Sequence, residues 1–170
     1  MKTQTIIITA YAILSTVTAI PVLASDGHAA VFPFGHSGEA RNVNRVIAVK
    51  ADDIFFNPNS ITVKAGETVK FIVTNTGRLP HEFVLGDKAE QAQHEKQMQA
   101  MQNMPMQGKG GISMPGMGND PNGIFIAPGE TKTLVWTFTR PGTVEYACHE
   151  PGHYAAGMVG RITIQRERRK

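Results

Sequence analysis

The chain has 170 residues, enough for one domain with a buried core, and its net charge is only +3. Basic and aromatic residues are not interleaved, which excludes a nucleic-acid-binding surface. The only cysteine, Cys148, cannot form an internal disulfide, so outside the cytoplasm its thiol has to be buried or bound to a metal.

Residues 1–24 are predicted to form a secretory signal peptide. A positively charged start precedes an apolar run over residues 6–20, and small residues then lead to a cleavage site between Ala24 and Ser25. The run is short and closed by Pro21, so an uncleaved membrane anchor is the weaker alternative. No cysteine directly follows the run, which excludes a lipid anchor of the bacterial lipoprotein type. We therefore expect an exported protein without stable membrane insertion after cleavage.

Residues 25–44 are expected to form a flexible N-terminal arm, because they are rich in Gly, Ala and Ser and show no sustained hydrophobic period. The arm carries His28 and His36. Isolated histidines in such a segment are usually exposed and without a role, although in an exported metalloprotein they can capture an ion weakly.

Short segments of β-type sequence follow, separated by turns that contain Gly, Pro and Asn. Val69, Phe71 and Val73 alternate with polar residues, and Trp136 and Phe138 share one face, so both sets should enter a core. The predicted strands cover residues 45–51, 60–64, 68–75, 81–85, 123–127, 131–139, 143–149 and 157–165. Their number and spacing predict an all-β fold, an antiparallel β-sandwich.

Residues 87–121 do not follow this pattern. Residues 87–103 contain no β-branched side chain and many good helix formers, and Asp87 with Glu90 resembles a capping pair, so a helix is predicted there. The Gly- and Pro-rich remainder cannot continue a helix. The sandwich is therefore expected to carry an insertion made of a helix and a methionine-bearing loop.

Residues 148–158 carry the chemistry of the chain. Cys148, His153 and Met158 follow one another at five-residue steps in one loop after a predicted strand. A thiolate and imidazoles suit the trigonal base of an electron-transfer copper site, and a thioether suits its weak axial contact. His81 is the candidate for the second imidazole. The alternative, a buried structural cysteine with Met158 in the core, explains Cys148 alone better than it explains the three residues together.

The part of the chain from residue 45 to residue 165 resembles the cupredoxins, the family of small blue-copper proteins with a Greek-key β-sandwich. The resemblance rests on the loop 148–158, on the run Phe56-x-Pro58…Ile61-x-Val63-x-x-Gly66-x-x-Val69-x-Phe71, and on Asn75-x-Gly77-x-x-x-His81. It implies one type 1 copper site with His81, Cys148 and His153 as equatorial ligands and Met158 as the axial ligand. A rigid site of this kind changes little between Cu(I) and Cu(II), which permits fast electron transfer.

The chain also departs from the family pattern. Its Cys-to-His spacing is longer than in plastocyanins, and Glu82 follows His81 where plastocyanins and azurins usually have an asparagine that ties the ligand loops together. Different hydrogen bonds around the ligands alter potential and colour, so the site could be green rather than blue.

His149, directly after Cys148, is similar to the Cys-His electron path of copper nitrite reductases and multicopper oxidases. Those enzymes take further copper ligands from other domains, and an oxidase-type binuclear centre would need a second cysteine in the loop. We therefore expect no enzymatic activity. Strand alternation places Cys148 inward and His149 outward. We expect both His149 and Glu150 to face solvent or a partner.

Six of the eight methionines lie in the insertion. Met98 and Met101 share one face of the predicted helix and are expected to pack against the sandwich. Packing does not explain the other four, which stand among Pro and Gly, and thioethers are soft ligands for Cu(I). A weak secondary copper site is therefore a hypothesis. His94 is a candidate member of it, but a plain surface position is favoured for this residue. The residues considered for secondary copper are Met98, Met101, Met104, Met106, Met114, Met117, His94, His28 and His36.

This combination resembles the exported cupredoxins associated with bacterial copper tolerance, which carry Met- or His-rich additions. The resemblance implies a periplasmic protein that binds Cu(I) loosely at the insertion, holds or oxidises copper at the cupredoxin site, and exchanges copper or electrons with a protein partner. Nothing in the sequence demands an oligomer, so a monomer is expected. The alternative is a dedicated electron shuttle of the plastocyanin/azurin kind, with the methionine loop as docking surface. The basic tail, residues 166–170, is expected to be exposed to solvent.

Overall fold

The computed structural model describes residues 31–102 and 120–167. Three sets of predictions lie outside the described residues: the signal peptide, His28, and the methionine-bearing loop. The loop residues that are not described include Met104, Met106, Met114 and Met117. The side chain of Met101, at the end of the helix, is not described either. Within the described residues, no helix combines the length and the apolar character needed to cross a membrane.

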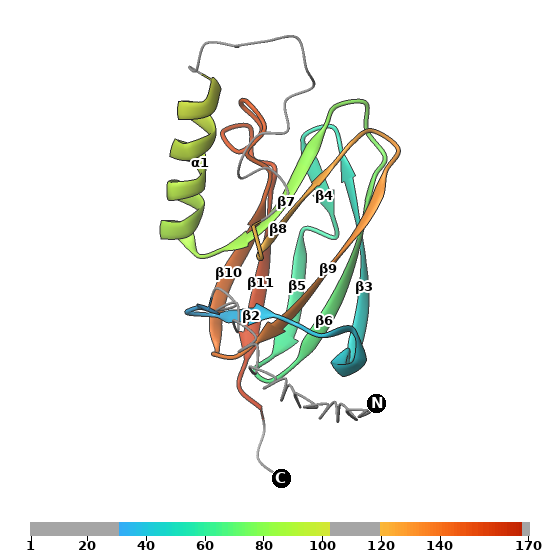
Figure 1. Ribbon diagram of the computed structural model, residues 1–170, viewed down its shortest axis with the longest axis vertical. Helices are drawn as coiled ribbons and strands as arrows, with labels where there is room; N and C mark the ends of the chain where they lie inside the picture. The colour runs from blue at the N-terminus through green and yellow to red at the C-terminus, as the bar shows by residue number, and fades with distance from the viewer. Residues whose placement is uncertain (1–30, 103–119, 168–170) are drawn as a thin grey trace, which may run out of the picture.

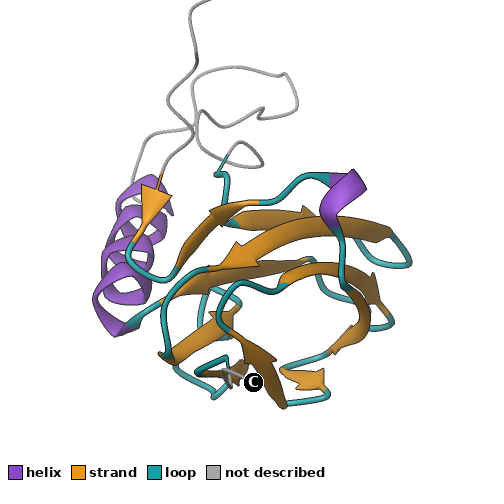
Figure 2. Cartoon of the chain, turned by 90° about the horizontal axis from the view of Figure 1, so that it is seen from below, coloured by secondary structure: helices purple, strands orange, loops and turns teal. Residues whose placement is uncertain are grey.

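Two β-sheets are stacked as layers (Figure 2), which confirms the predicted β-sandwich. The first sheet has the strand order β1 (Val31–Phe32), β2 (Gly35–Ser37), β9 (Thr131–Phe138), β6 (Thr68–Asn75), β3 (Arg45–Asp52) and β4 (Phe55–Asn57). The second has the order β5 (Ser60–Lys64), β11 (Val159–Gln165), β10 (Gly142–Ala147), β7 (His81–Gly86) and β8 (Gly123–Ile126). Pairing is antiparallel except for β3 with β6 and β5 with β11, which are parallel.

The core fills the space between the two sheets. Val69, Phe71 and Val73 of β6 and Trp136 and Phe138 of β9 are fully buried, as their alternation predicts. Aromatic rings from both sheets contact one another there, including Phe71, Phe83, Tyr146 and Phe56. This core holds the two sheets at fixed positions, and the ends of their strands carry the candidate site.

The prediction of a flexible arm is wrong for residues 31–44. Strands β1 and β2 form a hairpin, β2 pairs with β9, and a short 3-10 helix covers Ala40–Asn42. Phe34 is buried with its ring 5.3 Å from that of Trp136. Gly35 permits the close approach of β2 to β9, because a Cβ at that position would overlap the Thr137 carbonyl oxygen and the Trp136 indole. Strands of two and three residues are too short to show a hydrophobic period, so their pairing is not visible in the sequence.

The predicted helix is confirmed as α1 (Lys88–Gln102), and its capping pair forms. The N–H of Asp87 donates to Glu90 Oε2 at 2.8 Å, and the N–H of Glu90 donates to Asp87 Oδ1 at 3.0 Å. The helix stands beside β7 and β10 (Figure 1), on the face of the second sheet that is turned away from the core. Because both faces of β7 are covered, all six of its residues are buried.

Candidate metal centre

Cys148 directly follows β10, which ends at Ala147 rather than at the predicted His149. Its side chain is fully buried in the core, and its sulfur accepts a hydrogen bond from the backbone N–H of Glu82 at 3.3 Å. Burial raises the pKa of the thiol to about 12, although backbone N–H groups of Glu82 and Glu150 act against this shift. A thiolate at this position therefore requires a bound cation beside it.

The loop 148–158 folds back on itself and brings Cys148, His153 and Met158 together. Gly152 and Gly157 have φ angles of 82° and 93°, which side-chain-bearing residues rarely adopt, and so permit the two reversals. The N–H of Met158 donates to the His153 carbonyl at 2.9 Å, and the N–H of Cys148 donates to the Met158 carbonyl at 3.2 Å. Met158 is fully buried. Its role as axial ligand stays a prediction.

His81 begins β7 and reaches the site from the other ligand loop. Asn75, at the end of β6, holds this loop in place through its side-chain amide. Its Nδ2 donates to the carbonyls of Leu79 (2.7 Å) and Ile126 (3.0 Å), and its Oδ1 accepts the N–H of Gly77 at 2.9 Å. Asn75 was part of the family motif in the sequence, but its function as a brace becomes visible only in the fold.

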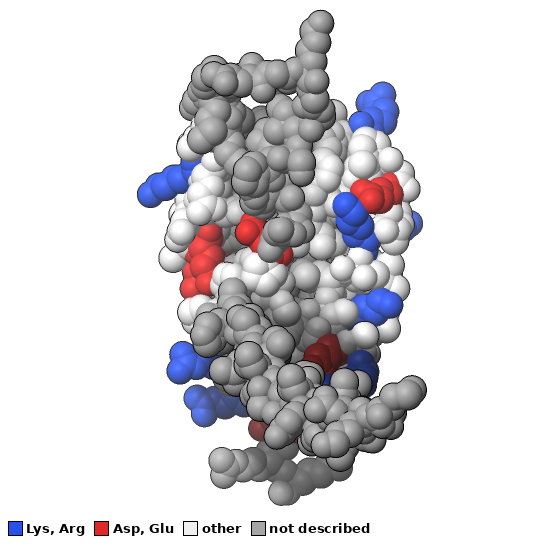
Figure 3. All heavy atoms as spheres, in the orientation of Figure 1, with Lys and Arg blue, Asp and Glu red and all other residues white. Residues whose placement is uncertain are grey.

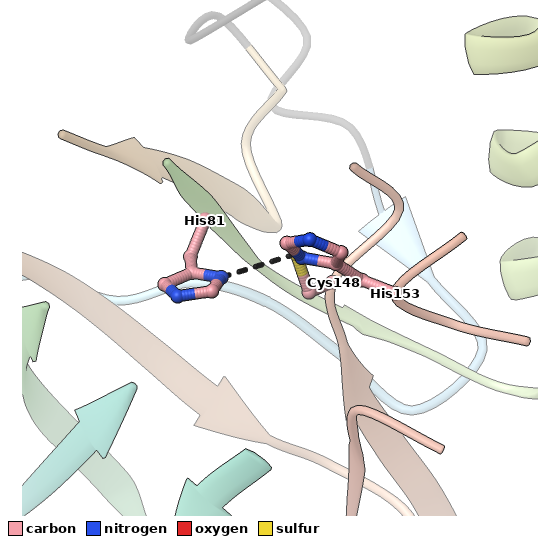
Figure 4. A group of neighbouring side chains, drawn as sticks. All are labelled: His81, Cys148 and His153. Atoms are coloured by element: carbon pink, nitrogen blue, oxygen red, sulfur yellow. Dashed lines mark hydrogen bonds between the residues drawn. The ribbon is translucent and has the colours of Figure 1, made fainter. Parts of the chain in front are cut away.

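Three side chains meet at this end of the sandwich (Figure 4). Cys148 Sγ lies 3.3 Å from His153 Nδ1 and 3.8 Å from His81 Nδ1. The three donor atoms all lie within 4.8 Å of one another, and each residue is buried. Among the described His, Cys, Asp and Glu residues, this is the group with the geometry to hold a metal ion. The structure thus brings together the three strong donors that the sequence singled out.

The protonation states of the histidines suit metal binding. Burial, and then the neighbouring His153, lower the pKa of His81, and burial also lowers the pKa of His153. Both imidazoles are therefore neutral near pH 7 and have a free lone pair. One soft sulfur and two imidazole nitrogens form a donor set that suits copper, so the residues present fit this cofactor.

The prediction that His149 is exposed to solvent or a partner is wrong. Its side chain is buried, because helix α1 covers the face of β10 that alternation assigned to solvent. His149 Nδ1 lies 2.7 Å from Glu95 Oε2, and Nε2 lies 2.7 Å from Gln91 Oε1. The ring also stacks on Tyr154, with centroids 4.7 Å apart. Burial, as the largest effect, lowers the pKa of His149.

Glu150 is only half-buried, yet one of its carboxylate oxygens, Oε1, is buried without a hydrogen-bond partner among the described residues. Burial, and then the nearby carboxylate of Glu82, raise its pKa to about 7. The expected outward, solvated position is therefore also wrong for Glu150.

His94 is not a surface residue either, since only 14% of its side chain is exposed. Its Nε2 lies 3.3 Å from Glu82 Oε2, and its Nδ1 lies 3.8 Å from Asp120 Oδ2. Burial alone would lower the pKa of His94, but the hydrogen bond and the charge of Glu82 outweigh it and raise the pKa. Glu82, which replaces the expected asparagine, thus connects the sulfur of Cys148 to helix α1.

The other described residues considered for secondary copper lie apart from the main site. Met98 is buried on helix α1, which agrees with the packing interpretation. His36 lies on β2, and its Nδ1 is 2.9 Å from the carbonyl of Ser37. A secondary copper site involving these residues stays a hypothesis.

Comparison with known proteins agrees with this geometry. Residues 43–165 match the family model of copper binding proteins of the plastocyanin/azurin family. The chain is 42% identical over 149 residues to the copper-resistant cuproprotein CopI of Pseudomonas aeruginosa, covering 78% of this chain and 82% of that protein. It is 39% identical over 139 residues to CopI of Rubrivivax gelatinosus, covering 81% and 77% respectively. A solved structure of auracyanin B is similar in fold, with a TM-score of 0.59 and 24% identity over 78% of this chain and 96% of that one.

Proposed function

The chain belongs to the plastocyanin/azurin family of copper-binding proteins, and on this basis we propose that it is an exported protein that handles copper in the periplasm and contributes to copper tolerance. Copper is its cofactor. The observation that carries the proposal is the buried group of His81, Cys148 and His153, whose donor atoms already lie within 4.8 Å of one another.

In this proposal His81, Cys148 and His153 are the strong ligands and Met158 is the weak axial ligand. Copper held there would supply one-electron exchange between Cu(I) and Cu(II). The protein's part is to keep the donors fixed and dry: the sandwich core excludes water from Cys148, and the N–H of Glu82 stabilises negative charge on its sulfur. A site that is already assembled needs little rearrangement when the oxidation state changes.

A role in copper tolerance is favoured over a dedicated electron shuttle by the similarity to proteins described as copper-resistant. The chain is 42% identical to CopI of Pseudomonas aeruginosa and 31% identical to the plastocyanin of Hordeum vulgare. A deletion strain should grow poorly at raised copper and normally at ordinary copper. A respiratory defect at ordinary copper would instead favour the shuttle, and fractionation of the cells would locate the protein.

The direct test of the site is titration of the metal-free mature protein with Cu(II). An intense thiolate-to-copper absorption band should grow and saturate near one equivalent, because one thiolate is available to one ion. The Cys148→Ala variant should lack the band. Copper that binds to the wild-type protein without the band would show that Cys148 is structural, and the proposed site would then be wrong at its centre.

A further inference from the structure

The second ring nitrogen of His81 faces a carboxylate. His81 Nδ1 is turned toward Cys148, while Nε2 is buried and lacks a hydrogen-bond partner among the described residues. Asp53 Oδ1 lies 3.9 Å from this Nε2. A buried N–H without an acceptor is costly, so the position of the carboxylate calls for an explanation.

Asp53 is held in place by the backbone of the ligand loop. Its Oδ1 accepts the N–H of Arg78 at 2.8 Å and the N–H of Leu79 at 3.2 Å. These bonds, the one from Arg78 first, hold the pKa of Asp53 below its usual value, so the group is negatively charged. The carboxylate is thus fixed to the same loop that delivers His81.

The surrounding backbone is shaped to accommodate this carboxylate. Gly77 has no room for a side chain, because a Cβ there would overlap the Asp53 carboxylate. Ile54, next to Asp53 in the turn between β3 and β4, has a φ angle of 72°, which β-branched residues rarely adopt. Unusual backbone conformations of this kind occur where function requires a side chain at a particular position.

We propose that Asp53 is a positioning residue for copper, whose carboxylate accepts the Nε2–H of His81 and thereby leaves Nδ1 free for the metal. The inference rests on the proposed function, in which His81 is a copper ligand. At 3.9 Å the two atoms are farther apart than in a hydrogen bond, so the proposal requires the Asp53 side chain, which is 31% exposed, to move closer to the ring. Carboxylates that accept the second N–H of a ligand histidine fix its tautomer and orientation and increase its basicity.

A negative charge beside His81 also has a consequence for redox chemistry. It favours Cu(II), with its higher positive charge, over Cu(I). Asp53 should therefore strengthen binding of Cu(II) more than binding of Cu(I), and its removal should shift the reduction potential to more positive values.

The first experiment uses the wild-type protein loaded with Cu(I), which is diamagnetic, and observes the histidine ring nitrogens by long-range ¹H–¹⁵N NMR. His81 should show a protonated Nε2 and a metal-bound Nδ1. A His81 ring with its proton on Nδ1 would overturn the assignment of Asp53 as acceptor. Loss of the thiolate-to-copper band from the wild-type protein would be a different result, because it would overturn the proposed function itself.

The second experiment compares Asp53→Asn with Glu67→Gln. The asparagine keeps an oxygen for the N–H groups of Arg78 and Leu79 but removes the charge that faces His81. Glu67 is the matched control, because its carboxylate also accepts a backbone N–H, that of Lys64, at 2.8 Å. Glu67 directly precedes β6, whereas Asn75 and the ligand loop lie at the other end of this strand. Each substitution replaces a carboxylate that accepts a backbone N–H by an uncharged amide, so each removes one negative charge.

The Asp53→Asn variant should bind Cu(II) about 10- to 100-fold more weakly, with a smaller loss for Cu(I). A tenfold difference between the two losses corresponds to a shift of about 59 mV in the reduction potential. Glu67→Gln should leave both affinities and the potential unchanged. Asp53 would only brace the loop if Asp53→Asn lost affinity for Cu(II) and Cu(I) equally, or if its reduction potential equalled that of the wild-type protein.

Discussion

At the scale of single residues, Met158 is the candidate ligand whose role depends most on a direct test, because a fully buried methionine is also an ordinary core residue. Met158→Leu separates the two roles. Leucine has a similar volume and no sulfur, so the free energy of unfolding of the metal-free protein should change by less than about 1.5 kcal/mol.

The copper-loaded Met158→Leu protein should keep its thiolate-to-copper band, since Cys148, His81 and His153 remain. Its reduction potential should rise, because loss of the axial thioether removes electron donation that stabilises Cu(II). Visible spectroscopy and potentiometry on the same sample check both expectations. An unchanged band together with an unchanged potential would assign Met158 to the core alone.

The candidate ligands could be predicted from the sequence, whereas Asp53, the group proposed to position His81, could not. Cys148, His153 and Met158 lie in one short loop, and a copper site needs a further imidazole, so few residues had to be considered. Asp53 has no such signal, because it reaches the ligand loop from 25 residues away and binds backbone N–H groups. Contacts of this kind are set by tertiary structure, and the identity of a residue does not reveal them.

At the scale of secondary-structure elements, helix α1 accounts for the wrong prediction at His149. Alternation along a strand gives the two faces of the strand, but it does not say what covers each face. The helix was predicted correctly from its composition and capping pair, yet its packing on β7 and β10 was not. Its side chains Gln91 and Glu95 therefore meet His149, which directly follows the candidate ligand Cys148.

Gln91 is the centre of this contact, because its buried amide bonds to two elements. Its Nε2 donates to the carbonyl of Val84 at 3.0 Å, and its Oε1 lies 2.7 Å from His149 Nε2. Gln91→Ala should lower the free energy of unfolding by about 1–3 kcal/mol per buried group left unpaired. Alanine favours helices, so the loss cannot be attributed to helix propensity.

The matched control is Gln93→Ala, two residues further along the same helix at an exposed position. It should change the free energy of unfolding by no more than about 0.5 kcal/mol. Chemical denaturation of both metal-free variants gives the comparison. If both substitutions changed the free energy of unfolding equally, the contacts of Gln91 with Val84 and His149 would not stabilise the protein as expected.

The pair of His94 and Glu82 adds a pH-dependent contribution to the same interface. The pKa of His94 is raised in the folded state, where Glu82, Asp120 and Glu95 face the ring, as does the imidazole of His149. A group with a raised folded-state pKa contributes stability that is fully present below its unfolded pKa of about 6.5 and is lost as the pH rises through the folded value.

His94→Gln removes this titration, so the difference in unfolding free energy between the wild-type protein and the variant should be largest near pH 6 and should shrink toward pH 8. Denaturation of the metal-free proteins across this range measures the difference. A difference that stays constant with pH would mean that His94 contributes by packing and neutral hydrogen bonds only.

At the scale of the whole molecule, the candidate site lies at one end of the core, and Cys148 and Met158 belong to both. The core lies between the sheets and holds aromatic rings from both, whereas the donors come from two loops at one end. Charged side chains do not gather around a single point on the face shown in Figure 3, where Lys and Arg lie apart with Asp and Glu between them.

Because most of the core consists of apolar side chains other than the candidate ligands, the metal-free protein should already be folded, and copper should add stability by mass action. One bound ion at 100 times its dissociation constant adds about 2.7 kcal/mol to the free energy of unfolding. Thermal unfolding with and without one equivalent of Cu(II) should show this gain in the wild-type protein, and Cys148→Ala should show a much smaller one because the thiolate donor is absent. Hydrogen exchange should slow mainly in the two ligand loops, residues 75–81 and 148–158, since the strands behind them are already protected. A metal-free protein that lacks the sandwich would instead mean that the ion organises the fold, and the assembled donors would then be a consequence of binding.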